Sequence, residues 1–121
     1  TSRGLGDVYK RQANDTDEKH FLIRKGAVPC GYLKINGLED GNDGWISILA
    51  VASAFQRKGI GKYAVSYAES FFKKQGKLCV KIHTTTDNYP ARKLYEKCGY
   101  LLCNSTNTYT AKDKLTYFKQ I

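Results

Sequence analysis

The sequence predicts an α/β domain in which helices cover a mixed β-sheet. Short apolar runs of strand length alternate with two longer segments of helical period, in the order β-β-β-α-β-α-β-β and without internal repeats. The 121 residues, 41% of them hydrophobic and 12% aromatic, suffice for one buried core but not for two. We therefore expect a single domain.

The first twelve residues, 1–12, show no helical or strand period and no signal-peptide pattern. They resemble the translation of a sequencing adapter. We therefore expect a non-native segment at 1–12 and the folded domain at 13–121.

Two strands and a central strand are expected in the first half of the domain. Phe21–Lys25 and Val28–Ile35 are apolar runs separated by Gly26-Ala27, which predicts a β-hairpin. A loop rich in turn residues follows over 36–44. Trp45–Val51 is nearly continuous in apolar character, so we expect a central strand that is covered on both faces.

A helix is expected to begin at Ile60 and to end before Gly76. Its apolar residues recur at the spacing of one helix face, namely Ala64, Val65, Ala68, Phe71 and Phe72. The run 77–82 then reads as another strand.

A second helix is expected from about Pro90, whose fixed φ suits the first helical turn, to Gly99. Its apolar face consists of Ala91, Leu94, Tyr95 and Cys98. Two final strands, 100–103 and 115–121, are joined through a turn rich in Thr and Asn.

Composition narrows the function classes. No apolar run approaches the ~18 residues of a membrane span. The four cysteines lack C-x-x-C spacing and no secretion signal precedes them, so we expect reduced thiols, a cytoplasmic protein and no zinc site.

The net charge is +9, and residues 57–81 carry seven Lys or Arg against one Glu. This stretch fits either an anionic partner or a solvated helix face. Nucleic acid is disfavoured as the partner, because the aromatic residues lie on core-like stripes.

The segment 49–62 combines a strand end, a short loop and a helix that opens at Gly59 and Gly61. Exposed backbone amides and the positive end of the helix dipole make such a segment a phosphate cradle. Gly59–Ala64 formally fits G-x-G-x-x-A, but seven residues separate it from its strand and Lys81 stands where a ribose-binding acid belongs. A P-loop fails as well, because Gln56 and Tyr63 occupy its first Gly and its hydroxyl position.

The segment resembles a different family. Gln56-Arg-Lys-Gly-Ile-Gly61 matches the Q/R-x-x-G-x-G/A signature of the GNAT family of N-acetyltransferases. The stretch from Asn88 to Tyr100 is similar to the second motif of that family, and Cys30–Ile35 is similar to its third strand. The resemblance runs from about Phe21 to the end of the chain.

The resemblance implies the GNAT-like acyl-CoA N-acyltransferase fold, with a central mixed, mostly antiparallel sheet flanked by helices and with the first strand and two helices missing here. It implies acetyl-CoA as cosubstrate, with its arm bound to the backbone of Leu49 and Val51. The pyrophosphate would lie on the backbone and side chains of the signature loop, that is Gln56, Arg57, Lys58, Gly59, Ile60, Gly61 and Lys62.

The resemblance also implies direct transfer of the acetyl group to an amine of a small molecule or a protein. Val51 N–H would stabilise the oxyanion, Tyr95 would protonate the departing thiolate, and Asn88 would cap the second helix and position the cofactor arm. A chain that binds CoA without turnover is the alternative, and a homodimer stays open.

Two departures from the family stand out. Ser53 replaces a common Pro, and 45–51 contains no acid that could deprotonate the amine. The identity of the base stays open between three alternatives, which are a loop acid (Glu39, Asp40 or Asp43), a water, and no dedicated base. His83 is interpreted as structural.

Overall fold

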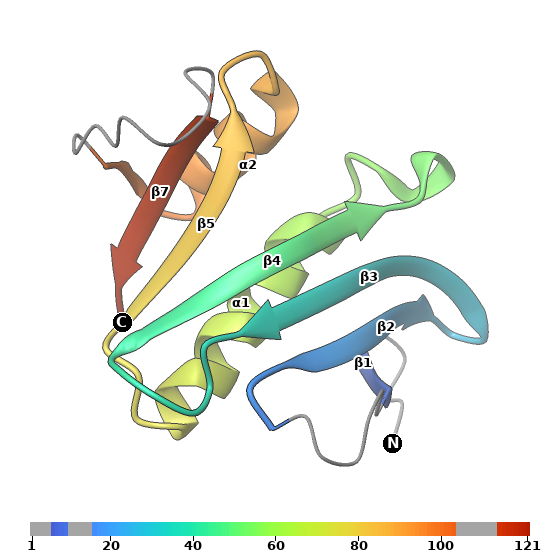
Figure 1. Ribbon diagram of the computed structural model, residues 1–121. Coiled ribbons are helices and arrows are strands. Elements are labelled where there is room, and N and C mark those ends of the chain that lie inside the picture. Colours follow the sequence, from blue (N-terminus) through green and yellow to red (C-terminus); the bar gives the residue numbers. More distant parts are fainter. Residues whose placement is uncertain (1–5, 10–15, 104–113) are drawn as a thin grey trace.

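The chain folds into one sheet with both helices on the same face (Figure 1). The computed structural model describes residues 6–9, 16–103 and 114–121. The elements are β1 (Gly6–Tyr9), β2 (Lys19–Lys25), β3 (Val28–Asn36), β4 (Asp43–Val51), a short 3₁₀ helix η1 (Ser53–Phe55), α1 (Ile60–Lys74), β5 (Cys79–Thr85), α2 (Tyr89–Lys97), β6 (Leu101–Leu102) and β7 (Lys114–Gln120).

The described strands form a mixed sheet in the order β1-β2-β3-β4-β5-β7-β6. Only the pair β4–β5 is parallel, and the other neighbours are antiparallel. This confirms the predicted fold class and the central position of β4. The predicted Thr/Asn-rich turn lies outside the described residues.

The core lies between the sheet and α1, as the helical stripe predicts. Ala64, Val65, Ala68 and Phe72 of α1 are buried, and Phe71 packs at the edge of the core. The sheet contributes the alternate residues of its inner face, among them Phe21, Ile23, Leu33, Ile35, Ile46, Val80, Ile82 and Tyr117. None of the described helices is long and apolar enough to cross a membrane.

The prediction that β4 is covered on both faces is wrong. Ile48 is 43% exposed and Ala50 is exposed as well. Both described helices lie on the inner face of the sheet, so no helix covers the outward side chains of β4. The run also contains an extra, unpaired residue, which shifts the alternation of its side chains. Lys34 pairs with Ile48 but the next residue, Ile35, pairs with Ile46, which leaves Ser47 as a β-bulge.

The structure contains one strand that the sequence did not predict and one strand that begins later than predicted. Gly6–Tyr9 lie in the segment for which no strand was expected, yet they pair with β2 as an antiparallel edge strand. Four residues are too few to show a period. β5 begins at Cys79 rather than at Lys77, because the Lys77 ammonium turns inward and donates to the carbonyls of Asp40 and Gly41 at 3.2 and 2.9 Å.

The inner face of β4 leaves no room for a side chain at Gly44, because a Cβ there would lie 2.4 Å from the Phe72 ring. We therefore expect Gly44→Ala to lower the free energy of unfolding by about 1–3 kcal/mol through overpacking. Urea unfolding measures this loss. Phe72→Leu in the same chain should restore part of it.

Gly41→Ala is the matched control, because its Cβ meets nothing within 4 Å and only the left-handed φ of +77° is unfavourable. A loss of about 1 kcal/mol is expected there. Equal losses at both glycines, with no rescue by Phe72→Leu, would contradict a packing constraint.

Candidate functional site

The sheet opens between its two parallel strands. β4 and β5 pair only from Asp43 to Ile46 and from Cys79 to Ile82. Beyond that point β4 stays paired with β3 as far as Val51, and β5 stays paired with β7 as far as Thr85. Figure 1 shows the two strands diverging toward their carboxyl ends. We call this opening the fork.

The Ser47 bulge lies where β4 leaves β5. It resets the alternation of side chains, so that Leu49 and Val51 pack toward the core while Ile48 faces out. The Ser47 hydroxyl donates a hydrogen bond to the Asn36 side-chain oxygen, which ties the bulge to β3. A bulge also increases strand twist, and this favours the divergence of β4 from β5.

The backbone of Leu49 and Val51 faces the fork. Ala52 N–H donates to Cys30 O at 2.8 Å, and in an antiparallel pair every second residue bonds the same neighbour. The backbone amide and carbonyl groups of Ala50 and Ala52 therefore point toward β3. Those of Leu49 and Val51 point into the opening. The side-chain amide of Gln56 donates to Val51 O at 3.1 Å at the rim.

The loop after β4 brings the amino end of α1 to the mouth of the fork. Arg57 has φ +63° and Gly59 has φ +82°, and these left-handed residues turn the chain into the helix. Tyr63 N makes the first intrahelical bond, to Gly59 O at 3.0 Å. The amides of Ile60, Gly61 and Lys62 precede it, and neither a capping side chain nor an acid of the first turn satisfies them.

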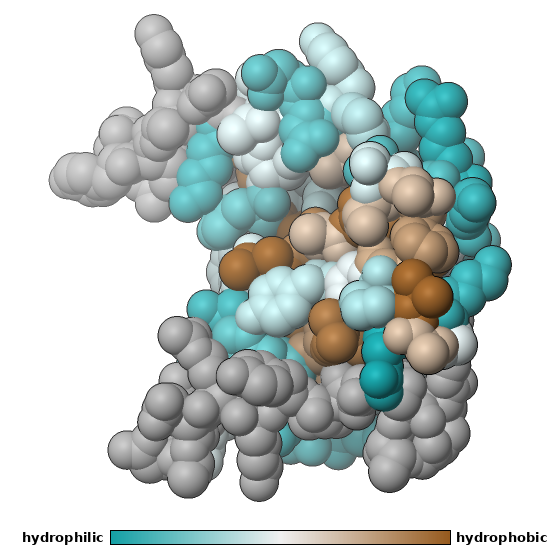
Figure 2. Space-filling model, turned by 90° about the vertical axis from the view of Figure 1, so that its right-hand side faces the viewer, coloured by the Kyte–Doolittle hydropathy of each residue, from teal (hydrophilic) through white to brown (hydrophobic). Residues whose placement is uncertain are grey.

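Three cationic residues belong to the same short segment as these amides. Arg57, Lys58 and Lys62 are exposed, whereas Ile60 is buried and anchors the helix start in the core. Seen from the side on which β4 ends, apolar side chains gather in the middle of the surface and hydrophilic ones border them (Figure 2). The mouth of the fork thus combines uncapped amides and exposed positive charge.

The two sequence motifs meet at Gly61. A Cβ at this position would lie 2.9 Å from Leu94 Cδ2, so the absent side chain lets α2 pack closely against α1. The two glycines therefore act differently, Gly59 through its left-handed φ and Gly61 through this approach. Asn88 caps α2 as predicted, because its Oδ1 accepts from Ala91 N at 3.3 Å.

Tyr95 follows Leu94 and is buried on the inner face of α2. Its ring lies 5.8 Å from that of Tyr117 and 6.3 Å from that of Tyr100. Burial raises the pKa of Tyr95 to about 12, with a smaller contribution from Cys98. Its hydroxyl bonds no group among the described residues, whereas the Tyr100 hydroxyl donates to Glu69 at 2.8 Å and the Tyr117 hydroxyl to Glu96 at 3.0 Å.

The sequence model of the Acetyltransferase (GNAT) family matches residues 2–100. The chain belongs to this family. No curated protein matches the chain.

Solved structures of acetyltransferases share the fold of this GNAT protein. An acetyltransferase from Bacillus subtilis, in complex with CoA, has a TM-score of 0.81 at 17% identity, and the match covers 97% of this chain and 98% of the other. The IAA acetyltransferase from Bacillus cereus has a TM-score of 0.77 at 20% identity, over 87% and 79% of the two chains. The PaiA N-acetyltransferase from Thermoplasma acidophilum, in complex with coenzyme A, has a TM-score of 0.75 at 19% identity, over 87% and 62%.

The loop acids that the sequence left open as bases lie at the closed end of the fork in this acetyltransferase. Asp43 begins β4, about 20 Å along an extended strand from Leu49, and pairs with Lys81 at 3.0 Å. Glu39 precedes it and accepts from the Thr16 hydroxyl. The side chains beside the opening are instead Trp45 and His83, whose rings lie 4.7 Å apart. No local sequence pattern could have predicted the contact between Trp45 and His83, because they are 38 residues apart in the sequence.

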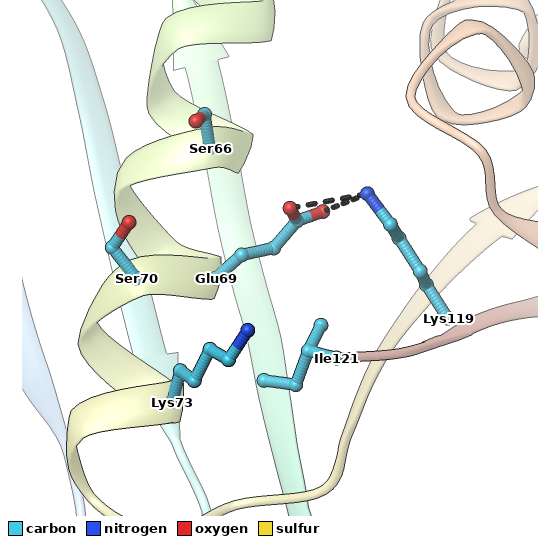
Figure 3. A pocket seen from close by; sticks show the side chains of 6 residues that line it. All are labelled: Ser66, Glu69, Ser70, Lys73, Lys119 and Ile121. Atoms are coloured by element: carbon cyan, nitrogen blue, oxygen red, sulfur yellow. Dashed lines mark hydrogen bonds and ion pairs between the residues drawn. The ribbon is translucent and has the colours of Figure 1, made fainter.

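A polar pocket lies between the second half of α1 and the end of β7 (Figure 3). Glu69 points across it to Lys119, with 3.2 Å between the charged atoms. The remaining lining residues are Ser66, Ser70, Lys73 and Ile121. Because α1 runs back along the sheet, with Phe72 near Gly44, this pocket lies at the closed end of the fork and is separate from the uncapped amides.

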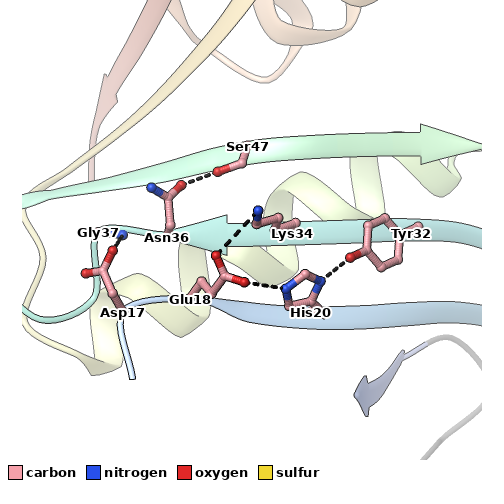
Figure 4. Close-up of polar contacts among 8 residues, drawn as sticks. All are labelled: Asp17, Glu18, His20, Tyr32, Lys34, Asn36, Gly37 and Ser47. Carbon is pink, nitrogen blue, oxygen red and sulfur yellow. Dashed lines mark hydrogen bonds and ion pairs between the residues drawn. The ribbon is translucent and has the colours of Figure 1, made fainter. Parts of the chain in front are cut away.

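A second polar cluster lies on the outer face of β2 and β3 (Figure 4). His20 contacts Glu18 Oε2 through Nε2 at 2.7 Å and the Tyr32 hydroxyl through Nδ1. His20 is only 3% exposed. Its hydrogen bond lowers the pKa of Glu18 below the ordinary value of 4.5, and Lys34 at 3.4 Å adds to this effect against the opposing effect of burial. The cluster joins the two strands of the hairpin.

The lowered pKa of Glu18 predicts an acid-sensitive contribution to stability. The bond to His20 stabilises the fold above pH 4.5 and is lost as the pH falls through the lowered pKa of Glu18. Glu18→Gln should therefore unfold at lower urea concentration than the unaltered chain at neutral pH, and the difference should vanish in acid. Lys34→Gln, which keeps the Glu18–His20 bond, should retain the acid sensitivity. If Glu18→Gln lowered the stability by the same amount at every pH, this role would be contradicted.

Proposed function

We propose that this GNAT protein transfers an acetyl group from acetyl-CoA directly to an amine held at the fork. The observation that carries the proposal is the junction of two sets of backbone groups that no neighbouring strand or helical turn satisfies. Leu49 and Val51 direct theirs into an opening between strands, and the first turn of α1 presents uncapped amides at its mouth. CoA has the matching parts, an extended amide-containing arm and a pyrophosphate.

The pyrophosphate lies on the amides of Gly59 to Lys62, which carry the positive end of the helix dipole. Arg57, Lys58 and Lys62 add charge at exposed positions. The arm then enters the fork as an extra strand beside β4 and passes Val51 before Leu49. Its far end, the thioester, therefore lies nearer to Leu49. We therefore assign the developing oxyanion to Leu49 N–H in place of Val51 N–H, the donor that the sequence resemblance implied, and Val51 holds the arm.

Transfer begins when the amine nitrogen attacks the thioester carbon. The carbonyl oxygen becomes an oxyanion, and one well-placed backbone N–H lowers the barrier by ~3–4 kcal/mol. The C–S bond then breaks, and the thiolate takes its proton from the Tyr95 hydroxyl. The raised pKa of Tyr95, about 12, keeps this proton in place at neutral pH until the thiolate forms.

CoA binding without turnover is the second candidate. It is favoured by the absence of a carboxylate from the described part of the fork, since 45–51 contains no acid and Asp43 is paired at the closed end. Turnover with any primary amine would reject it. We further propose a cytoplasmic location, because the cysteines are thiols and three of the four are at least partly accessible.

The uncapped end of α1 predicts where CoA binds. The double substitution Lys58→Gln and Lys62→Gln removes two cations beside the proposed pyrophosphate site. It should weaken acetyl-CoA binding on the order of tenfold and reduce its salt dependence, because charge-assisted contacts to phosphate are lost. Isothermal titration calorimetry at two salt concentrations measures both effects.

The matched control is Lys73→Gln with Lys74→Gln, which removes two cations from the last turn of the same helix. Its affinity for acetyl-CoA should stay within about twofold of the unaltered chain, since the sites are separated by more than a Debye length of ~10 Å. Equal weakening by both double variants would show a general charge effect and reject the pyrophosphate site.

Tyr95 separates an enzyme from a binding protein. Tyr95→Phe should lower kcat about 100-fold, the typical contribution of a general acid, while the Kd for acetyl-CoA stays unchanged. Release of the CoA thiol reports the rate. Tyr117→Phe serves as the control, because its hydroxyl is bonded to Glu96 and Arg92. Full activity of Tyr95→Phe would remove this residue from the proton path.

A further inference from the structure

The outer side of the fork carries one histidine at the point of divergence. Ile46 and Ile82 form the last pair of β4 with β5, and His83 is the next residue of β5. Ile82 is buried on the inner face, so His83 faces the outer side, away from α1. The uncapped amides of α1 lie on the inner side. An amine that meets the thioester from the outer side therefore passes His83.

The His83 ring is held from two directions. It lies against the Trp45 indole of β4, with centroids 4.7 Å apart and planes inclined by 38°. Its Nδ1 lies 2.9 Å from the Thr116 hydroxyl of β7. With Nδ1–H donating to Thr116, the lone pair of the ring is on Nε2. Leu49 is about two strand residues, or ~7 Å along the strand direction, beyond the level of His83. The imidazole and a substrate nitrogen lie within this interval on the outer side of the fork.

We propose that His83 is the general base that takes the proton of the acceptor amine. This inference rests on the proposed acetyl transfer. As the N–C bond forms, Nε2 of His83 accepts one proton from the amine nitrogen. The C–S bond then breaks, and Tyr95 protonates the thiolate. His83 returns its proton to solvent and Tyr95 takes one up, so the enzyme ends in its starting state.

The charges around His83 favour its neutral form. Burial lowers the pKa of His83, Lys114 of β7 lowers it further, and a hydrogen bond to the Leu115 backbone partly opposes both. Lys81 precedes it on the same face and is paired with Asp43 of β4. Trp45 and Thr116 are uncharged. A neutral imidazole at physiological pH can accept a proton without first losing one.

The test compares two nucleophiles with acetyl-CoA. Each neutral nucleophile loses one proton as its N–C bond forms. The adduct of Nα-acetyl-lysine amide, a strongly basic amine, needs a base to take this proton, whereas the adduct of weakly basic hydroxylamine is acidic enough to lose it to water. His83→Gln should lower kcat/KM about 100-fold for the lysine probe and less than tenfold for hydroxylamine, above the uncatalysed rates. In the unaltered chain, kcat/KM for the lysine probe should rise with pH as the free amine forms, with an additional limb below neutrality from the titration of His83. The variant should lack this additional limb. The Kd for acetyl-CoA should not change.

Lys81→Gln is the matched control, since Lys81 also contacts Trp45, with its ammonium 5.7 Å from the ring. It should keep both activities within about twofold of the unaltered chain. Equal loss with the two nucleophiles, an unchanged rate for His83→Gln, or a pH limb that survives in the variant would each overturn the assignment.

A second measurement does not depend on turnover. The ring resonances of the two histidines can be followed by NMR and assigned with His83→Gln. Acetyl-CoA should shift the His83 signals and leave those of His20, in the hairpin cluster, in place. Bound acetyl-CoA with an unmoved His83 overturns this inference alone. Failure of the folded chain to bind acetyl-CoA overturns the proposed function as well.

Discussion

The divergence of β4 from β5 is the constraint on which the rest of the site depends. Each strand keeps its other partner to the end, since Val51 still pairs with Gly31 and Thr85 with Lys114. The Ser47 bulge lets β4 turn away while its apolar side chains return to the core. Without it, Leu49 and Val51 would point outward, and Ile48 and Ala50 would take their places on the inner face.

Such an opening leaves backbone groups without partners, which a sheet interior ordinarily avoids. The same is true of the first turn of α1, where Gly59 supplies no capping side chain. The two unsatisfied sets lie next to each other because the 52–59 loop is short. An extended ligand with amides at one end and phosphates at the other satisfies both sets at once. The backbone groups that face the fork and those of the first turn of α1 thus match the extended arm and the pyrophosphate of acetyl-CoA.

Elements with a strong local signal could be predicted from the sequence. The stripe of Ala64, Val65 and Ala68 predicts the buried face of α1, and the predicted capping by Asn88 is confirmed by its hydrogen bond. The bulge could not be predicted, because Ser47 reads as an ordinary polar position and its displacement arises only from pairing with β3. The edge strand β1 was not predicted, for a related reason. It forms through backbone pairing with β2, and its four residues are too few to show a period.

The residues of the candidate site likewise divide into those with a local sequence signal and those without one. Gly59 and Tyr95 could be found because each belongs to a motif, whereas Trp45 and His83, 38 residues apart, meet only through the parallel pairing of Ile46 with Ile82. The two groups proposed to handle protons then respond to one physical cause. Burial raises the pKa of Tyr95 and lowers that of His83, because it disfavours the charged form of each. At neutral pH the acid therefore holds its proton and the base holds its lone pair, on opposite faces of one sheet.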